Sequence, residues 1–500
     1  MFNNKLAASS IATYFSRITT GFFSFVTSYI LIRYLNKEDY GSYQLIFSMN
    51  TLIVYITSFG LASIFLRYIP EFLEKKYFAG LFKLTYGGIG IRMFSVSVIL
   101  LLSKVFSEWI FSYFLFTPFL QEYYQVILIF IFLLKLDEVM GPSILGAYLE
   151  QVKLLYVQII QSVLRLAVIA TSIYYGFGLN GIILGLLIIE FVICFAYGVI
   201  IYTVLHNLKI EFLLNNTDIE FPYKRIAKFG GYAFLISAAG TFRDITVGNF
   251  VITHFLGPTI VAEFGVVYTI LALISGFNPA MLLKTQINHT LVRKYTDKKD
   301  KNYFVLAHRL TSSLSMIYLL PIFFWIAINC KSTIAFFNPV YTSSSTILLI
   351  LLPFYFSNAL QFSYGPIFSA LEKMQYRFYA NIFSIYNLIA DIIFIQVWGI
   401  EGVAIATTSA SILTLLYFHY VVVKKLHLDL KFYWKGLLLI ILNVMITLVG
   451  TILLIRFIDI NSFLFESLLF AILYIFITFK NMPLYDLDMD ILKKVIFKRG

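Results

Sequence analysis

Residues 180–203 read NGIILGLLIIEFVICFAYGVIIYT, an apolar run in which Glu190 is the only charged side chain. As a helix this run would be about 36 Å long, enough to cross the hydrocarbon core of a bilayer, which is about 30 Å thick. The same pattern holds for the whole chain, because 60% of its 500 residues are hydrophobic and only 13% are charged. Soluble domains average about 25% charged residues. The sequence therefore predicts an all-α integral membrane protein.

Fourteen segments of the chain are long and apolar enough to span a membrane. They lie at 10–33, 42–66, 84–104, 123–146, 154–175, 180–203, 229–254, 260–283, 305–329, 344–370, 377–397, 401–423, 436–456 and 461–479. The first segment is too long for the core of a cleavable signal and lacks a small-residue cleavage site, so we interpret it as a span. The shortest connection is Trp398-Gly399-Ile400-Glu401-Gly402, which joins segments 377–397 and 401–423.

The basic residues predict the orientation of these segments. Cytoplasmic loops of membrane proteins carry an excess of Lys and Arg. With the N-terminus in the cytoplasm, 28 of the 38 Lys and Arg residues fall in inner segments and only 5 in outer segments. We therefore expect both termini to be cytoplasmic. The net charge of +12 then reflects membrane topology and not a nucleic-acid partner.

The second half of the chain resembles the first. Four motifs recur in order: Tyr40-Gly41 as Phe264-Gly265, Gly141-Pro142 as Gly365-Pro366, Ala147-Tyr148-Leu149-Glu150 as Ala370-Leu371-Glu372-Lys373, and Gly178-Leu179-Asn180-Gly181 as Gly399-Ile400-Glu401-Gly402. Their nearly constant offset covers six segments, an even number, so the two copies share one orientation and are related by an axis along the membrane normal. We expect two parallel six-helix lobes at 1–222 and 223–432, a two-helix addition at 433–482 and a basic cytoplasmic tail at 483–500.

Two stretches beside the second segment carry a family resemblance. They are Arg33-Tyr34-Leu35-Asn36-Lys37-Glu38-Asp39-Tyr40-Gly41-Ser42-Tyr43 and Arg67-Tyr68-Ile69-Pro70-Glu71. Together with the fourteen segments and the six-plus-six repeat, they resemble the polysaccharide transporters of the multidrug/oligosaccharidyl-lipid/polysaccharide (MOP) superfamily, which also contains multidrug exporters and the lipid II flippase. The resemblance covers nearly the whole chain. Within the motif, we expect Gly41 to let the chain turn tightly before it re-enters the membrane.

The resemblance implies a function in transport and not in catalysis. It implies a flippase of the O-antigen (Wzx) or capsule type, which moves undecaprenyl-diphosphate-linked oligosaccharide to the outer leaflet of a bacterial inner membrane by alternating access. A polysaccharide polymerase and a chain-length regulator are the partners it suggests. Within the superfamily, a multidrug or cation antiporter and a lipid II-type flippase are alternatives. A membrane-embedded polymerase or glycosyltransferase is a further one, although no large loop or soluble domain is evident.

Five cations lie inside the predicted spans, where each would cost about 2.5–3.5 kcal/mol if it faced lipid. They are Arg17, Arg92, Lys135, Arg165 and Arg243. One interpretation is that they line a cavity for the diphosphate, since guanidinium groups bind phosphate oxygens in a bidentate manner. The alternative is internal ion pairing. Lys135 and Glu138 are three residues apart and can meet on one helix face, and Glu190 supplies another acid.

Carboxylates inside the spans are candidates for binding a coupling proton or cation, because a buried carboxylate can carry a proton. They are Asp137, Glu138, Asp244 and Asp391. Simple charge pairing is an equal alternative for each of them. The duplicated Gly141-Pro142 and Gly365-Pro366 are candidate hinges, with packing kinks as the alternative. The sequence contains no phosphate-binding glycine loop and no metal-binding pattern, so we expect no metal and no cofactor.

Overall fold

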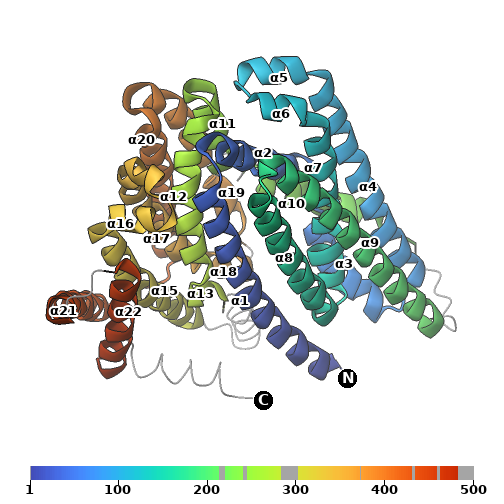
Figure 1. Cartoon of the computed structure of the whole chain (residues 1–500). Coiled ribbons are helices and arrows are strands. Elements are labelled where there is room, and N and C mark those ends of the chain that lie inside the picture. The colour runs from blue at the N-terminus through green and yellow to red at the C-terminus, as the bar shows by residue number, and fades with distance from the viewer. Residues whose placement is uncertain are drawn as a thin grey trace. The chain divides into compact units, whose positions relative to one another are not determined.

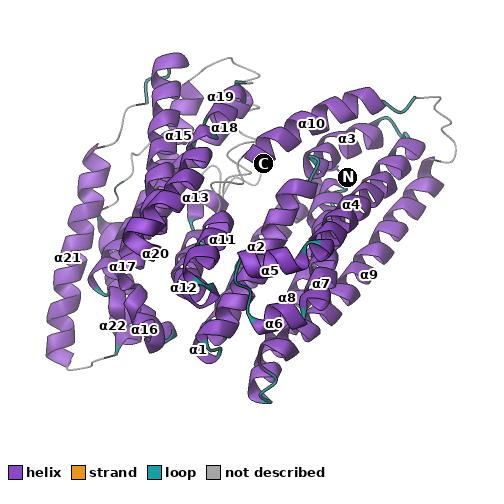
Figure 2. Cartoon of the chain, turned by 90° about the horizontal axis from the view of Figure 1, so that it is seen from above, coloured by secondary structure: helices purple, strands orange, loops and turns teal. Residues whose placement is uncertain are grey.

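The computed structural model describes residues 2–212, 220–239, 245–282, 302–371, 373–430, 434–458, 462–481 and 483. These residues are almost entirely helical, and no strand occurs among them (Figure 2). The predicted all-α class is therefore confirmed. The chain forms two compact units, Met1–Gly265 and Val266–Gly500. This division differs from the repeat boundary expected at residue 222, and the predicted lobes stay a prediction.

Unit 1 holds the first helices of the chain, with short helices in one loop and one π-helical turn. They are α1 (Phe2–Tyr34), α2 (Lys37–Thr57), α3 (Leu61–Glu74), α4 (Phe78–Val105), α5 (Ser107–Tyr113), α6 (Pro118–Glu122), α7 (Tyr124–Glu138), η1 (Val139–Leu145), α8 (Gln151–Tyr174), α9 (Gly178–Phe212), α10 (Tyr223–Ala239) and α11 (Ile245–Leu256). The next helix, α12 (Pro258–Gly276), begins in unit 1 and continues into unit 2.

Unit 2 holds the remaining helices. They are α13 (Pro279–Leu282), α15 (Asn302–Ile328), α16 (Cys330–Phe337), η3 (Pro339–Ser344), α17 (Ser345–Gln361), α18 (Tyr364–Ala370), α19 (Gln375–Tyr379), α20 (Ile382–Tyr420), η4 (Val421–Lys425), α21 (Trp434–Ile458) and α22 (Phe463–Lys480). The last two pack against each other and against α15 (Figure 1). Trp325 of α15 stacks on Phe470 of α22, and its indole N–H donates to Ser467 Oγ at 3.0 Å. Of the predicted tail at 483–500, all but residue 483 lies outside the described residues.

Each of the fourteen predicted spans overlaps at least one of these helices. Among the described residues, ten helices are long and apolar enough to cross a membrane, or eleven if α2 and α3, bent by 55°, form one span. The number is smaller than fourteen partly because α7 is only 15 residues long before it continues as η1. In addition, the helical stretch Gln375–Lys425 is one of the ten, although the sequence predicted two spans there, 377–397 and 401–423. The chain is a multi-pass membrane protein, and the number fourteen stays a prediction.

Burial in both units is reversed relative to a soluble protein. Large apolar side chains such as Phe94, Tyr174 and Phe457 are 73%, 84% and 88% exposed, whereas the charged Arg92 and Asp391 are 2% and 0% exposed. An exterior of exposed aromatic and aliphatic side chains is stable in lipid and not in water. The charged groups therefore lie inside the helix bundles, as the cost of placing them in lipid requires.

The long helix α20 consists of two segments that run in opposite directions. The hydroxyl groups of Tyr386 and Ser409 lie 3.1 Å apart although they are 23 residues apart in sequence. A straight helix would separate them by about 34 Å. The reversal occurs at Gly399, whose φ of +59° and ψ of −140° are essentially restricted to glycine. The short connection seen in the sequence is thus a one-residue turn.

A related but longer turn occurs in the first copy of the sequence repeat, where three residues separate α8 from α9 and Gly176 also has a positive φ, of +73°. Gly178, the counterpart of Gly399 in that copy, has φ of +56°. In both copies a second glycine follows three residues later, and an added Cβ at Gly181 or Gly402 would collide with the preceding segment. Two helical hairpins of the chain, α8–α9 and the two halves of α20, are therefore closed by matching glycine pairs.

The expected role of Gly41 is wrong. Gly41 is buried inside α2, and the chain bends before it, where Asn36 caps the helix by accepting from Asp39 N at 2.8 Å. A Cβ at Gly41 would collide with the carbonyl oxygen of Pro258 at the start of α12. Gly41 thus allows two helices to approach closely, and the ion pair of Lys37 with Glu263 at 2.7 Å joins the same two helices.

We predict that Gly399→Ala destabilises the protein by about 1–3 kcal/mol, because alanine cannot adopt the backbone conformation of the turn without strain. Gly450→Ala in α21 is the matched control. A Cβ there makes only an ordinary contact, and alanine favours a helix. Thermal unfolding of the purified protein in detergent measures both. Equal melting temperatures for the two variants would contradict the assigned turn.

Candidate functional site

Two helices of unit 1 place two cations around one carboxylate. Arg92 lies on α4, and Lys135 and Glu138 lie on the last turn of α7. Arg92 Nη2 and Lys135 Nζ both contact Glu138 Oε2, at 3.1 and 3.3 Å, and Arg92 Nη1 donates to Thr57 Oγ1 at 2.8 Å. Both cations are 2% exposed, but the Glu138 side chain is 43% exposed. This Arg92 cluster (Thr57, Arg92, Lys135, Glu138) is thus buried at its cations and open at its carboxylate.

A second cluster joins α7 to α8 and α9, which pack against one another (Figure 2). Glu190 of α9 is 0% exposed and accepts from Arg165 of α8 through Nη2 and through Nε, the latter at 3.2 Å. Gln161 Nε2 donates to Glu190 at 3.2 Å and to Asp137 Oδ2 at 3.3 Å. This Glu190 cluster (Asp137, Gln161, Arg165, Glu190) lies next to the Arg92 cluster, because Asp137 and Glu138 are consecutive on α7.

The two clusters balance each other in charge. With every group ionised, they contain three cations, Arg92, Lys135 and Arg165, and three carboxylates, so their formal charges cancel. The contact of Lys135 with Glu138, expected from their spacing, is confirmed. The pairs Arg92–Glu138 and Arg165–Glu190 join residues that sequence reasoning did not pair. Internal ion pairing is therefore present for these three cations, and their role in binding a substrate stays a prediction.

The other site residues expected from the sequence lie elsewhere or are not described. Arg17 is exposed on α1, beside Ser16, whose hydroxyl donates to Gln158 Oε1 of α8 at 2.7 Å. Arg243 and Asp244 lie outside the described residues. The structure therefore does not bring all five predicted cations together among the residues that it describes.

The candidate hinges lie where helices change their geometry. Gly141 and Pro142 are in the π-helical turn η1 that directly follows the Arg92 cluster on the chain, and a Cβ on Gly141 would collide with the ring of Tyr197. Gly365 and Pro366 are in α18, which follows a break after Gln361. Single π-helical turns inside longer helices often occur at functional sites. A hinge role for either pair stays a prediction.

A large apolar groove lies in unit 1, and sequence reasoning did not find it. Its volume is about 1210 Å³, and residues of α3, α4, α10 and the end of α2 line it. Gly87, Gly90 and Gly231 line the groove, and a Cβ added to any of them would meet open space. Part of the open space in the groove therefore exists because these three positions are glycines and carry no side chain. The Gly87-Gly88-Ile89-Gly90 run in a helix was the signal that could have indicated it, because glycine is otherwise unfavourable there.

The groove and the Arg92 cluster share one residue. Thr57 lines the groove, and its hydroxyl accepts from Arg92 Nη1. None of the charged side chains of the Arg92 cluster lines the groove. Lys83, which lies outside the cluster, is the charged residue among those that line it. A large apolar space thus adjoins a largely buried polar cluster, which is an arrangement suited to an amphipathic ligand.

Unit 2 contains a separate buried carboxylate. Asp391, in the first half of α20, is 0% exposed and accepts through Oδ2 from Asn387 Nδ2 at 3.1 Å. Its other oxygen, Oδ1, has no hydrogen-bond partner among the described residues. No cation contacts Asp391 in the described part of the chain. Since an unpaired buried carboxylate is costly, this position is suited to binding a proton or a small cation.

Comparisons with known proteins give a family and a fold. Residues 6–281, more than half of the chain, match the model of the family described as polysaccharide biosynthesis protein. No curated protein matches the sequence. The solved structure of the lipid II flippase MurJ, in an inward closed conformation, is similar with a TM-score of 0.67 and 18% identity, over 98% of this chain and 100% of MurJ.

Two other solved structures show the same fold. An inward-facing multidrug resistance MATE family transporter of the MOP superfamily is similar with a TM-score of 0.64 and 15% identity, over 83% of this chain and 99% of its own. A MOP superfamily transporter from Pyrococcus furiosus gives a TM-score of 0.53 and 16% identity, over 83% and 94%. At these identities the likeness concerns the fold.

We predict that Glu138→Gln lowers the stability of the protein by about 3–5 kcal/mol, because two buried cations lose their shared carboxylate. Glu150→Gln, which breaks the partly exposed pair with Lys153, is the control and costs about 0–1 kcal/mol. Thermal unfolding in detergent measures both. Adding Lys135→Met to Glu138→Gln removes one uncompensated charge and restores part of the loss, and failure of this rescue would argue against charge balance as the cause.

Proposed function

This chain belongs to the polysaccharide biosynthesis protein family and has the fold of MOP superfamily transporters, and from that premise we propose that it is a lipid-linked oligosaccharide flippase. Its substrate is undecaprenyl-diphosphate-linked oligosaccharide, the repeat unit of an O-antigen or a capsule. The protein acts in the bacterial inner membrane with both termini in the cytoplasm, as the basic loops indicate. It moves the head group outward by alternating access and is not an enzyme.

One observation carries this proposal: Thr57, which lines the apolar groove of unit 1, also belongs to the Arg92 cluster. A lipid-linked sugar has the same two parts, a long hydrocarbon chain and a charged diphosphate. The groove offers hydrocarbon surface to the prenyl chain. Arg92 retains a donor for the diphosphate, since its Nε has no partner among the described residues.

Charge balance then controls when the diphosphate binds. In the absence of substrate, the carboxylates of Asp137, Glu138 and Glu190 balance the charges of Arg92, Lys135 and Arg165. When a proton neutralises Asp137 or Glu138, one positive charge is left over, and a phosphate oxygen becomes the better partner. Proton binding and substrate binding are thereby linked, and the partly exposed Glu138 is the group that solvent reaches most easily.

Asp391 is the second coupling residue that we propose. It binds a proton or a monovalent cation in unit 2, where its free Oδ1 and the neighbouring Asn387 supply oxygen ligands. Alternating access then depends on both repeats, with bends at Gly141-Pro142 and Gly365-Pro366. A polymerase and a chain-length regulator act on the product outside the membrane. A lipid II-type substrate has the same diphosphate-prenyl junction, and competition by lipid II in the transport assay distinguishes it.

We predict that Gly87→Leu combined with Gly90→Leu lowers the transport rate at least about tenfold, because several methylene groups of the substrate chain lose their place in the groove. Both positions face open space, so the variant should fold. Leu101→Phe, which enlarges an exposed residue of α4 away from the groove, is the control. Accessibility of the lipid-linked sugar to an impermeant lectin in proteoliposomes measures transport. Wild-type rates in the double variant would contradict the proposal.

We predict that Asp391→Asn abolishes the acceleration of transport by an imposed proton or sodium gradient, because the neutral amide cannot take up a proton and lacks the negative charge that attracts sodium. The remaining rate equals that of the wild type without a gradient. Glu401→Gln, in the same hairpin but at its turn, keeps the acceleration. The same proteoliposomes, prepared with each gradient in turn, provide the measurement. Persistent acceleration in Asp391→Asn would show that coupling occurs elsewhere.

A further inference from the structure

A small pocket in unit 2 plays no part in the proposed transport cycle. It has a volume of about 190 Å³ and is formed by α15, the end of α17, α18, the last turns of α20 and Leu430. Pockets that enclose a whole drug-sized ligand measure about 300–1000 Å³, so this one accommodates a small chemical group. Its lining includes Arg309, His308, His419 and Ser312, and the described residues of the lining include no carboxylate.

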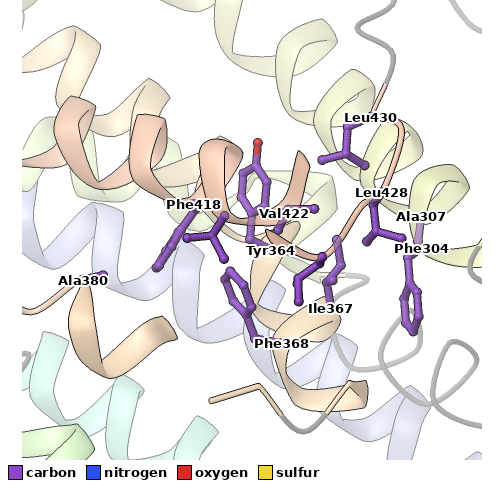
Figure 3. Packing of buried hydrophobic residues seen from close by; sticks show 12 residues of the cluster. Phe304, Ala307, Tyr364, Ile367, Phe368, Ala380, Phe418, Val422, Leu428 and Leu430 are labelled. Atoms are coloured by element: carbon purple, nitrogen blue, oxygen red, sulfur yellow. The ribbon is translucent and has the colours of Figure 1, made fainter. Parts of the chain in front are cut away.

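The two imidazole rings of this pocket are fixed by hydroxyl groups, one of which belongs to a buried apolar cluster. Tyr364, which lines the pocket, packs with Phe418 and Val422 in a buried cluster, and its hydroxyl points away from the carbon atoms of that cluster (Figure 3). That hydroxyl lies 3.2 Å from His419 Nδ1, and His308 Nδ1 lies 2.7 Å from Ser363 Oγ. Because each ring is fixed through Nδ1, its Nε2 is the nitrogen left for a ligand.

Ser312 gives the independent indication of a ligand. The side chain lines the pocket and the residue is 7% exposed, yet its hydroxyl has no hydrogen-bond partner in the part of the chain that the structure describes. Buried hydroxyl groups are nearly always hydrogen-bonded, because leaving one unpaired is costly. An unpaired hydroxyl beside an arginine and an imidazole, in a lining whose described residues include no carboxylate, matches an anion that accepts hydrogen bonds.

The surroundings of the pocket indicate where the anion comes from. The lining also contains the aliphatic side chains of Met316 and Leu416. Lys424 and Lys425 lie exposed in η4, directly after the end of α20. The sequence places this end of α20 and the start of α15 at the same membrane interface, where exposed lysines attract anionic lipids. We propose that the pocket binds the phosphate group of an anionic membrane lipid.

This inference does not rest on the flippase proposal, since it concerns the binding of a lipid to a separate site in unit 2. Arg309 forms charge-assisted hydrogen bonds to the phosphate, and Ser312 and the Nε2–H of His419 donate the others. The acyl chains of the lipid lie outside the pocket along its aliphatic side. A bound lipid of this kind would fasten the ends of α15 and α20 to the interface.

Binding of short-chain phosphatidic acid to the purified full-length protein in detergent tests the proposal, with native mass spectrometry as the readout. Ser312→Ala removes an unpaired hydroxyl, so it should leave the lipid-free protein at least as stable as the wild type, while lipid binding weakens at least about tenfold. Arg309→Gln should weaken it further. Lys424→Gln is the control for general attraction and should change binding less than either pocket variant.

Three outcomes would overturn the proposal. Wild-type affinity in both Ser312→Ala and Arg309→Gln would show that the lipid binds elsewhere. Equal binding of the corresponding diacylglycerol, which lacks the phosphate, would exclude recognition of the anion. Equal occupancy by inorganic phosphate at the same concentration would show a site for free phosphate and not for a lipid head group.

Discussion

The structure of unit 1 depends on the neutralisation of charge inside a membrane protein. A cation that faced lipid at the depth of Arg92 or Lys135 would cost several kcal/mol, and the carboxylate of Glu138 removes that cost by contacting both. One helix, α7, supplies Lys135, Asp137 and Glu138 within four residues, so it takes part in both clusters. The positions of α4, α8 and α9 around α7 follow from these contacts as much as from apolar packing.

Balanced charge also explains how one bundle can be stable when empty and still attract an anion. Buried ion pairs add little net stability, because desolvation offsets most of their Coulomb attraction. Exchanging one carboxylate for a phosphate oxygen therefore involves a small free-energy difference, whereas removing the carboxylate alone involves a large one. The geometry suits a site in which the cations exchange a carboxylate for a phosphate oxygen. The nearby groove supplies the apolar contact that a lipid chain needs.

Much of the fold was predictable, because apolar runs of about 20 residues can satisfy their backbone groups in lipid only as helices. The contact of Lys135 with Glu138 was predictable because it is local. The pairing of Arg92 with Glu138 was not, since 46 residues separate them and the choice of partner is made by tertiary packing. Gly41 was misread because a glycine serves close helix packing as well as a turn, and the groove was missed because its glycines act through the side chains that they lack.

The one-residue turn at Gly399 has a consequence for biogenesis. It leaves no polar loop that could be drawn across the bilayer after the first half of α20 has crossed. The two halves must therefore leave the translocon together as a preformed pair. Asp391 would then enter the membrane already covered by Asn387 and by the second half of the hairpin. Both halves of α20 therefore have to be synthesised before either half inserts.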